Sequence, residues 1–243
     1  MSRTKFVVSL LLVVCLLLQG CMYPNELRKE NQASAKDGIL LVQHAVDEYQ
    51  KRNSLLPIVT ADQSVPRYEK FKVDFEALLT NQVLSAIPAN AFENGGTGVY
   101  LIVNEEIKPT VRLMHLPTAQ RVNDLQRAVT MYIEKHEGQL PSKEQIYPGF
   151  FEISLEKIGA RPVDIRSPYS GDSLPFIMDE QGNVFADYAP DIMKAVEKSG
   201  KKPADHTDQV QELLVTEGLF VPVKSPVYEW RENAPWPKQS VRI

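Results

Sequence analysis

The chain has 243 residues, with 31 acidic side chains against 27 lysines and arginines, and a formal net charge of −4. This length is enough for one large domain or two small ones. No basic patch of the kind that binds a phosphate backbone stands out, so nucleic acid is not an expected partner.

The N-terminus has the pattern of an export signal. Arg3 and Lys5 form a short positive region, and residues 6–18 are apolar apart from Ser9. This run is shorter than the roughly 20 residues that a membrane-spanning helix needs, and it fits the apolar region of a secretory signal. The alternatives are an ordinary secretory signal that is followed by an incidental cysteine, Cys21, and an apolar anchor that is not cut.

The signal ends in a motif that resembles the bacterial lipobox, Leu18-Gln19-Gly20-Cys21. The resemblance implies that residues 1–20 are a lipoprotein signal peptide, cut between Gly20 and Cys21, and that Cys21 carries a diacylglyceryl group. Two acyl chains on one residue, palmitate among the fatty acids expected, suffice for a stable anchor. We therefore expect a lipoprotein held at the extracytoplasmic face of the cell membrane.

Cleavage changes the charge and the cysteine content. The mature chain loses Arg3 and Lys5, which changes the net charge from −4 to −6. Cys15 leaves with the signal and Cys21 is the lipid site, so the mature domain has no cysteine for a disulfide, a thiolate zinc site or a redox pair. The domain is expected to rely on its hydrophobic core.

Four segments are predicted after the signal. Residues 21–36 are mostly polar and are interpreted as the lipidated cysteine and a polar tether, which would span roughly 20 Å if it is flexible. Residues 37–116 and 117–200 are predicted to be two related α+β units, and residues 201–243 a C-terminal helix and a tail that contains prolines and tryptophans.

Three blocks of sequence recur in the same order in the two units. Residues 43–49 resemble 126–132, residues 73–78 resemble 153–158, and residues 101–105 resemble 176–180. Leu-Pro pairs follow the first block at Leu56-Pro57 and Leu140-Pro141. The order of the blocks predicts an internal repeat.

Each unit is predicted to contain a long amphipathic helix, a short helix and a β-hairpin. Apolar residues recur at helical spacing over 39–49 and 122–132. Asp74 and Ser154 are placed to cap the short helices. Two β-rich runs follow in each unit, and Gly182-Asn183 is suited to a hairpin turn. The predicted fold class is therefore α+β, with two tandem repeat units and small antiparallel sheets.

The C-terminal part is predicted to hold a helix over residues 190–198, another around residues 210–214, and an extended or irregular tail. The tail carries Tyr228, Trp230 and Trp236 among prolines. Tryptophan is enriched at interface hot spots, so these three residues are candidate partner contacts. The alternative, which we favour, is that the rings complete the core of the second unit.

Part of the second unit resembles the periplasmic domain of type II secretion major pseudopilins. The similarity lies in residues 128–132, Gly138-Gln139-Leu140-Pro141 and residues 167–176, and more faintly in residues 39–115. It implies a long helix packed on a small antiparallel sheet. The chain has no prepilin cleavage site and no N-terminal filament helix, so filament functions do not carry over. The overall layout also resembles lipoproteins of endospore-forming bacilli.

No motif predicts a catalytic, cofactor or metal site. The four histidines do not form a zinc-binding spacing; they are His44, His115, His136 and His206. Asp172, Asp179 and Asp187 surround the second hairpin. Roles in turns and at strand edges explain these three carboxylates better than a calcium site does. Glu105, Glu106 and Glu180, with Asp179, are expected at solvated hairpin tips, where carboxylates seldom have the shifted pKa of catalytic groups.

The sequence therefore favours a non-enzymatic binding or scaffold protein of the cell envelope, with an envelope protein as its partner. The resemblance to lipoproteins of endospore-forming bacilli adds sporulation as a candidate process. Two alternatives remain open: an envelope hydrolase, and a solute-binding lipoprotein that serves a transporter.

Overall fold

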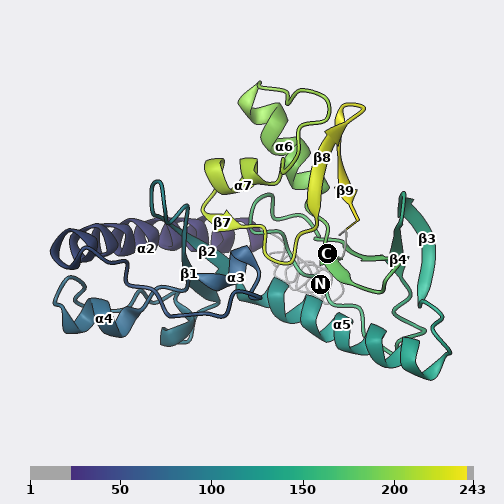
Figure 1. Ribbon diagram of the computed structural model, residues 1–243, viewed down its shortest axis with the longest axis horizontal. Coiled ribbons are helices and arrows are strands. Elements are labelled where there is room, and N and C mark those ends of the chain that lie inside the picture. Colours follow the sequence, from purple (N-terminus) through teal and green to yellow (C-terminus); the bar gives the residue numbers. More distant parts are fainter. Residues whose placement is uncertain (1–22, 240–243) are drawn as a thin grey trace, which may run out of the picture.

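A computed structural model describes residues 23–239, and within them it confirms the predicted α+β class (Figure 1). The strands form a three-stranded sheet in the order β1-β2-β7, a four-stranded sheet in the order β3-β4-β5-β6, and the two-stranded sheet β8-β9. The signal peptide, Gly20 and Cys21 lie outside the described residues.

The predicted tether is helical from Tyr23 onward. Helix α2 spans Tyr23–Asn53 as one element. Glutamate, lysine, arginine, glutamine and alanine, which are frequent in this polar segment, are all good helix formers. Ala35 and Ile39 of this helix are buried. Residues 23–36 of the predicted tether are therefore helical.

The first unit packs α2 against a hairpin. Helix α3 spans Arg67–Lys70, α4 Phe75–Thr80 and the 3₁₀ helix η2 Phe92–Asn94, and strands β1 (Gly98–Val103) and β2 (Thr110–His115) pair antiparallel. Asp74 caps α4 as predicted, because its carboxylate accepts a hydrogen bond from the backbone N–H of Ala77 at 2.9 Å. Val42 and Val46 of α2 and Leu78 of α4 are fully buried in this core.

The second unit has helix α5 (Leu116–Lys135) and four antiparallel strands. These are β3 (Ser142–Tyr147), β4 (Phe150–Ile153), β5 (Phe176–Asp179) and β6 (Val184–Ala186). Strands β5 and β6 are the predicted hairpin. Strands β3 and β4 lie between the predicted long and short helices, where the sequence analysis predicted no strand. They were missed because β3 is an edge strand whose polar side chains are mostly exposed and show no apolar alternation.

The short helix predicted after Ser154 is a turn. Residues 155–159 form turns rather than a helix, and the Ser154 hydroxyl accepts only a long contact, 3.4 Å, from the backbone N–H of Lys157. Gly159, with a φ of +62°, and Pro162 interrupt a continuing helix. Ser154 therefore begins a turn, and the short helix that it was expected to cap does not form.

The two units nevertheless share a set of equivalent contacts. In the first, the Gln43 side chain accepts from the N–H of Val111 at 2.7 Å and donates to the carbonyl of Pro109 at 3.2 Å. In the second, Gln126 accepts from the N–H of Val184 at 2.8 Å and donates to the carbonyl of Gly182 at 2.9 Å.

The segments that follow the two long helices make equivalent contacts as well. The N–H of Asp74 donates to the carbonyl of Pro57 at 2.8 Å, and that of Ser154 donates to the carbonyl of Pro141 at 2.7 Å. These contacts are what a repeat predicts, and the internal repeat itself stays a prediction.

The two glutamines should be equally important for stability. Gln126→Ala leaves the backbone N–H of buried Val184 without its acceptor, and we expect a loss of about 1–3 kcal/mol in the free energy of unfolding. Gln43→Ala should cost a similar amount for the same reason. Urea unfolding measures both, with Gln120→Ala at an exposed position of α5 as the control. A Gln126→Ala variant as stable as its control would contradict this role.

The chain then returns toward the first unit. Helix α6 spans Ala189–Ser199, close to the predicted 190–198, and ends at Gly200 in the left-handed region, with a φ of +64°. Helix α7 spans Glu212–Glu217, and strand β7 (Phe220–Val221) pairs parallel with β2 of the first unit. The C-terminal segment therefore binds both units rather than following them.

The tail is a β-hairpin, not an irregular segment. Strands β8 (Val227–Arg231) and β9 (Ala234–Lys238) pair antiparallel. Glu232 and Asn233 between them have φ values of +51° and +67°, as a two-residue hairpin turn requires. Pro235 and Pro237 lie in β9, an edge strand where a missing N–H is tolerated. Because of these two prolines, the sequence analysis did not predict this strand.

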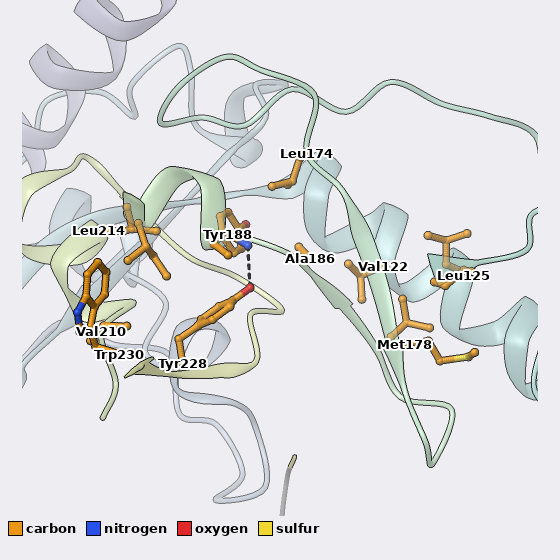
Figure 2. Close-up of a cluster of buried hydrophobic side chains, with 14 of the residues drawn as sticks. Val122, Leu125, Leu174, Met178, Ala186, Tyr188, Val210, Leu214, Tyr228 and Trp230 are labelled. Atoms are coloured by element: carbon orange, nitrogen blue, oxygen red, sulfur yellow. Dashed lines mark hydrogen bonds between the residues drawn. The ribbon is translucent and has the colours of Figure 1, made fainter. Parts of the chain in front are cut away.

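Two of the three candidate partner contacts are core residues. Tyr228 and Trp230 are 0% and 2% exposed, and Figure 2 shows Trp230 beside Val210 and Leu214. The Tyr228 hydroxyl accepts from the backbone N–H of Tyr188 at 2.9 Å and donates to Asp187 at 2.7 Å. Neither ring is available to a partner in this fold. Trp236 is half-buried, edge-on to the ring of Tyr147 at 6.2 Å between centroids.

The hairpin should be needed for stability. Trp230→Ala opens a cavity in the core of the second unit, and we expect it to lower the free energy of unfolding by about 3–5 kcal/mol. Trp236→Ala, at a half-buried position, is the matched comparison and should cost less. Thermal and urea unfolding measure both. If Trp230→Ala melted like the unaltered protein, the packing described above would be incorrect.

Candidate functional site

A groove of about 460 Å³ lies between helix α6, the turn at residues 168–170, and the α7–β7 segment. Its apolar lining comes from Leu214, Leu219 and Phe220. Gln32 of α2 also lines it, so all three parts of the chain meet here. None of these elements forms the groove alone, which is why the sequence did not reveal it.

Helix α6 places three charged side chains on the groove. Asp191, Lys194 and Lys198 lie at positions i, i+3 and i+7, which is one face of a helix. Pro190 stands in the first turn, where its missing N–H costs nothing, and Lys198 lies in the last turn. The ammonium of Lys194 pairs with the carboxylate of Asp172, outside the groove lining.

Asp191 is a buried carboxylate, 4% exposed, that faces the groove. Its Oδ2 accepts a hydrogen bond from the Ser167 hydroxyl at 2.7 Å. Within the described part of the chain no donor meets hydrogen-bond geometry at Oδ1. Burial raises the pKa of Asp191, while Ser170, Ser167 and Lys194 oppose the rise. The result is a buried acidic group whose pKa reflects burial opposed by the neighbouring serines and by Lys194.

Aromatic rings form the inner wall of the groove. The ring of Tyr169 lies edge-on to Tyr188 at 5.8 Å and to Phe220 at 6.5 Å between centroids. Burial raises the pKa of the Tyr169 hydroxyl well above its usual value. This tyrosine therefore remains neutral and presents a rigid, mainly apolar surface.

Polar groups behind the groove connect the first unit to α7. Arg112 of β2 donates from Nε to the carbonyl of Val215 at 2.8 Å. Glu212 accepts from the Tyr68 hydroxyl at 2.5 Å and from the Arg67 guanidinium at 2.7 Å. Burial, and then the carboxylate of Glu212, raise the pKa of Tyr68. These contacts fix α7 and hence one wall of the groove.

The residues singled out from the sequence have other roles. Asp179 is fully buried, contrary to the expectation of a solvated tip, because its Oδ1 accepts from the backbone N–H groups of Gln181 and Asn183 at 2.9 and 2.8 Å. Asp187 is also buried and accepts from the hydroxyls of Tyr228 and Tyr147 at 2.7 and 3.0 Å. Both carboxylates organise turns and core packing.

The histidines have separate environments. His44 is exposed on α2, His136 stacks on Tyr132 at 3.8 Å, and His206 contacts Glu229 at 2.7 Å. His115 is packed against Phe220 behind the groove. Over residues 23–239, no cluster of three or more histidine, cysteine, aspartate or glutamate side chains has the arrangement of a metal site.

The sequence analysis missed Asp191. The spacing of Asp191, Lys194 and Lys198 in the sequence places them on one face of a helix. However, Ser167, which donates a hydrogen bond to Asp191, lies 24 positions earlier in the chain. Only the fold shows that these groups surround a groove.

His115 should make stability depend on pH. Burial lowers the pKa of its ring to about 4, from 6.5. Between these values the unfolded chain binds the proton and the folded chain does not, so the free energy of unfolding falls as pH falls from 6.5 to 4. The contribution is about 3 kcal/mol.

His115→Gln removes this titration, so we expect the pH dependence of stability to become flatter over that window. Urea unfolding at a series of pH values measures it, and His44→Gln on the exposed face of α2 is the control. A His115→Gln variant that kept the full slope would show that another group is responsible.

Comparison with known proteins places a family match on the first unit. Residues 35–115 match the model of the YphF family N-terminal domain. The match begins within α2 and ends at the last residue of β2, close to the 37–116 limits predicted for the first unit. No curated protein and no solved structure matches the chain.

None of the helices in the described part of the chain, residues 23–239, is both long and apolar enough to span a bilayer.

Proposed function

We propose that the protein is a lipoprotein anchored by lipid on Cys21 at the extracytoplasmic face of the cell membrane. The observation that carries the proposal is the order of features at the N-terminus: a positive start, an apolar run, then Gly20-Cys21. Helix α2 is described from Tyr23 onward, two positions after Cys21. The lipid anchor would then be joined to the domain through a helix.

Its role in the envelope is binding rather than catalysis. The groove has a volume of about 460 Å³, which is within the usual range of small-molecule sites, roughly 300–1,000 Å³. Apolar walls and a few converging polar groups are typical of such sites. A scaffold role with an envelope protein partner, in sporulation among other processes, is compatible with the same anchor.

An envelope hydrolase is the second candidate function. It is favoured by the raised pKa of Asp191, because a buried acid in a cleft can act as a proton donor. Such an enzyme would need a second catalytic group that acts on the substrate. Glu217 is the other carboxylate that lines the groove. Turnover of wall polymers that is lost in Asp191→Asn would favour this candidate over binding. The groove is also compatible with a further alternative, a solute-binding lipoprotein that serves a transporter.

Palmitate labelling tests the anchor. Cys21→Ser removes the thiol that accepts the diacylglyceryl group, so we expect the variant to incorporate no labelled palmitate. Cys15→Ser, in the apolar run, is the matched control and should be labelled like the unaltered chain. Persistent labelling of Cys21→Ser would overturn the proposal.

A further inference from the structure

The first unit carries a further groove, of about 520 Å³, beside helix α4, which we call the α4 groove. It shares no lining residue with the groove at α6, and Figure 1 shows the two helices well apart. The lining is mostly apolar and includes Val59, Leu79 and Ile87. Val59 and Leu79 are 49% and 37% exposed, so this apolar surface is open to a partner.

Hydrogen bonds hold the walls of the α4 groove in place. The N–H of Val59 donates to the carbonyl of Lys72 at 2.9 Å, which fixes the segment that precedes α4 in space. The side-chain amide of Asn94 donates to the carbonyl of Ile87 at 3.1 Å, which ties Ile87 to the 3₁₀ helix η2. The groove is therefore formed in the free protein, and a partner would have little to order on binding.

Two exposed carboxylates stand among these apolar side chains. Glu76 precedes Leu79 by three positions on α4, so the two side chains lie on one face of the helix. Glu93 belongs to η2 and also lines the groove. Within residues 23–239, neither glutamate forms an ion pair. The third acid of the lining, Asp74, is occupied as the cap of α4. Two negative charges therefore remain available to a cation.

The combination of apolar surface and negative charge selects the class of partner. An aliphatic side chain is stabilised when it leaves water for the groove. A lysine or arginine next to that side chain is attracted by Glu76 and Glu93. The same two carboxylates repel an anionic lipid surface and a phosphate backbone. A protein segment that alternates basic and aliphatic residues matches both features.

We propose that the α4 groove docks a segment of a partner protein in which an aliphatic side chain is flanked by lysines or arginines. The aliphatic side chain packs against Val59, Leu79 and Ile87. The basic side chains pair with Glu76 and Glu93. The proposal rests on the binding role in the envelope proposed above, and it names the chemistry of the protein partner.

Three capped tripeptides test the apolar and the charged contributions separately: N-acetyl-Lys-Leu-Lys amide, N-acetyl-Glu-Leu-Glu amide and N-acetyl-Lys-Ser-Lys amide. Titration into the mature lipidated protein, held in a neutral detergent, measures each dissociation constant from shifts of the methyl NMR signals of Val59, Leu79 and Ile87. We expect the first peptide to bind about tenfold more tightly than either of the others, because each of them lacks one of the two contributions.

Variants then assign the contributions to residues. Glu76→Gln and Glu93→Gln should each weaken binding of the Lys-Leu-Lys peptide about two- to fivefold, as the loss of an exposed ion pair does. Leu79→Ser should weaken both leucine peptides and leave the preference for the basic one. Glu106→Gln, an exposed glutamate of the same unit outside the groove, is the matched control and should bind like the unaltered protein. Thermal melting checks that each variant is folded.

The outcomes separate this proposal from the proposed function. Equal binding of the basic and acidic leucine peptides, or no shift of the three methyl signals with any peptide, would overturn the docking proposal while palmitate labelling of Cys21 still stood. A Glu106→Gln variant weakened as much as Glu76→Gln would overturn it too, because overall charge would then explain the preference. Labelling that persists in Cys21→Ser would overturn the anchor whatever the α4 groove binds.

Discussion

The pairing of β7 with β2 is the constraint on which the rest of the structure depends. The N–H of Leu113 donates to the carbonyl of Leu219 at 3.0 Å, and Met114 lies opposite Val221. This contact brings the chain back to the first unit after it has completed the second. Helix α7, just before β7, therefore packs on both: Leu214 belongs to the core of the second unit, and Val215 to a cluster with β1 and β2. Without that return the groove would have no second wall.

The same junction explains why polar groups are partly buried there. Arg112, Tyr68 and Glu212 each make a directed hydrogen bond across the contact between β2, α3 and α7. A buried polar group stabilises an interface only if it finds its partner, so these bonds define one arrangement of α7 more strictly than apolar packing alone would. His115 and Asp191 lie nearby with opposite effects on stability. The lowered pKa of His115 weakens the fold as pH falls, while the raised pKa of Asp191 favours the folded state at low pH.

Elements with a strong apolar period could be predicted from the sequence, and elements without one could not. The spacing of Val42 and Val46, and of Val122 and Val129, defined the faces of α2 and α5, and both hairpins built from β-rich runs were found. Strand β3 escaped because its side chains are mostly solvated, and β9 because two of its residues are prolines. The helical conformation of the polar start of α2 was not predicted, because low hydrophobicity resembles disorder when helix propensity is ignored. The groove escaped because Asp191, Tyr169 and Phe220 come from separate segments, and no local pattern connects them.

Helix α2 bears on where the groove would lie relative to the membrane. Gln32 of α2 lines it, and α2 begins at Tyr23. A helix rises 1.5 Å per residue, so Gln32 stands about 14 Å along the axis from that first residue. With lipid on Cys21 in the bilayer, as proposed, the groove would be held close to the membrane surface. A flexible tether would let the domain sample many heights and orientations, whereas a helix that continues into the core transmits the position of its first turn to everything packed on it. The geometry therefore favours ligands that are found at, or delivered to, the layer next to the membrane.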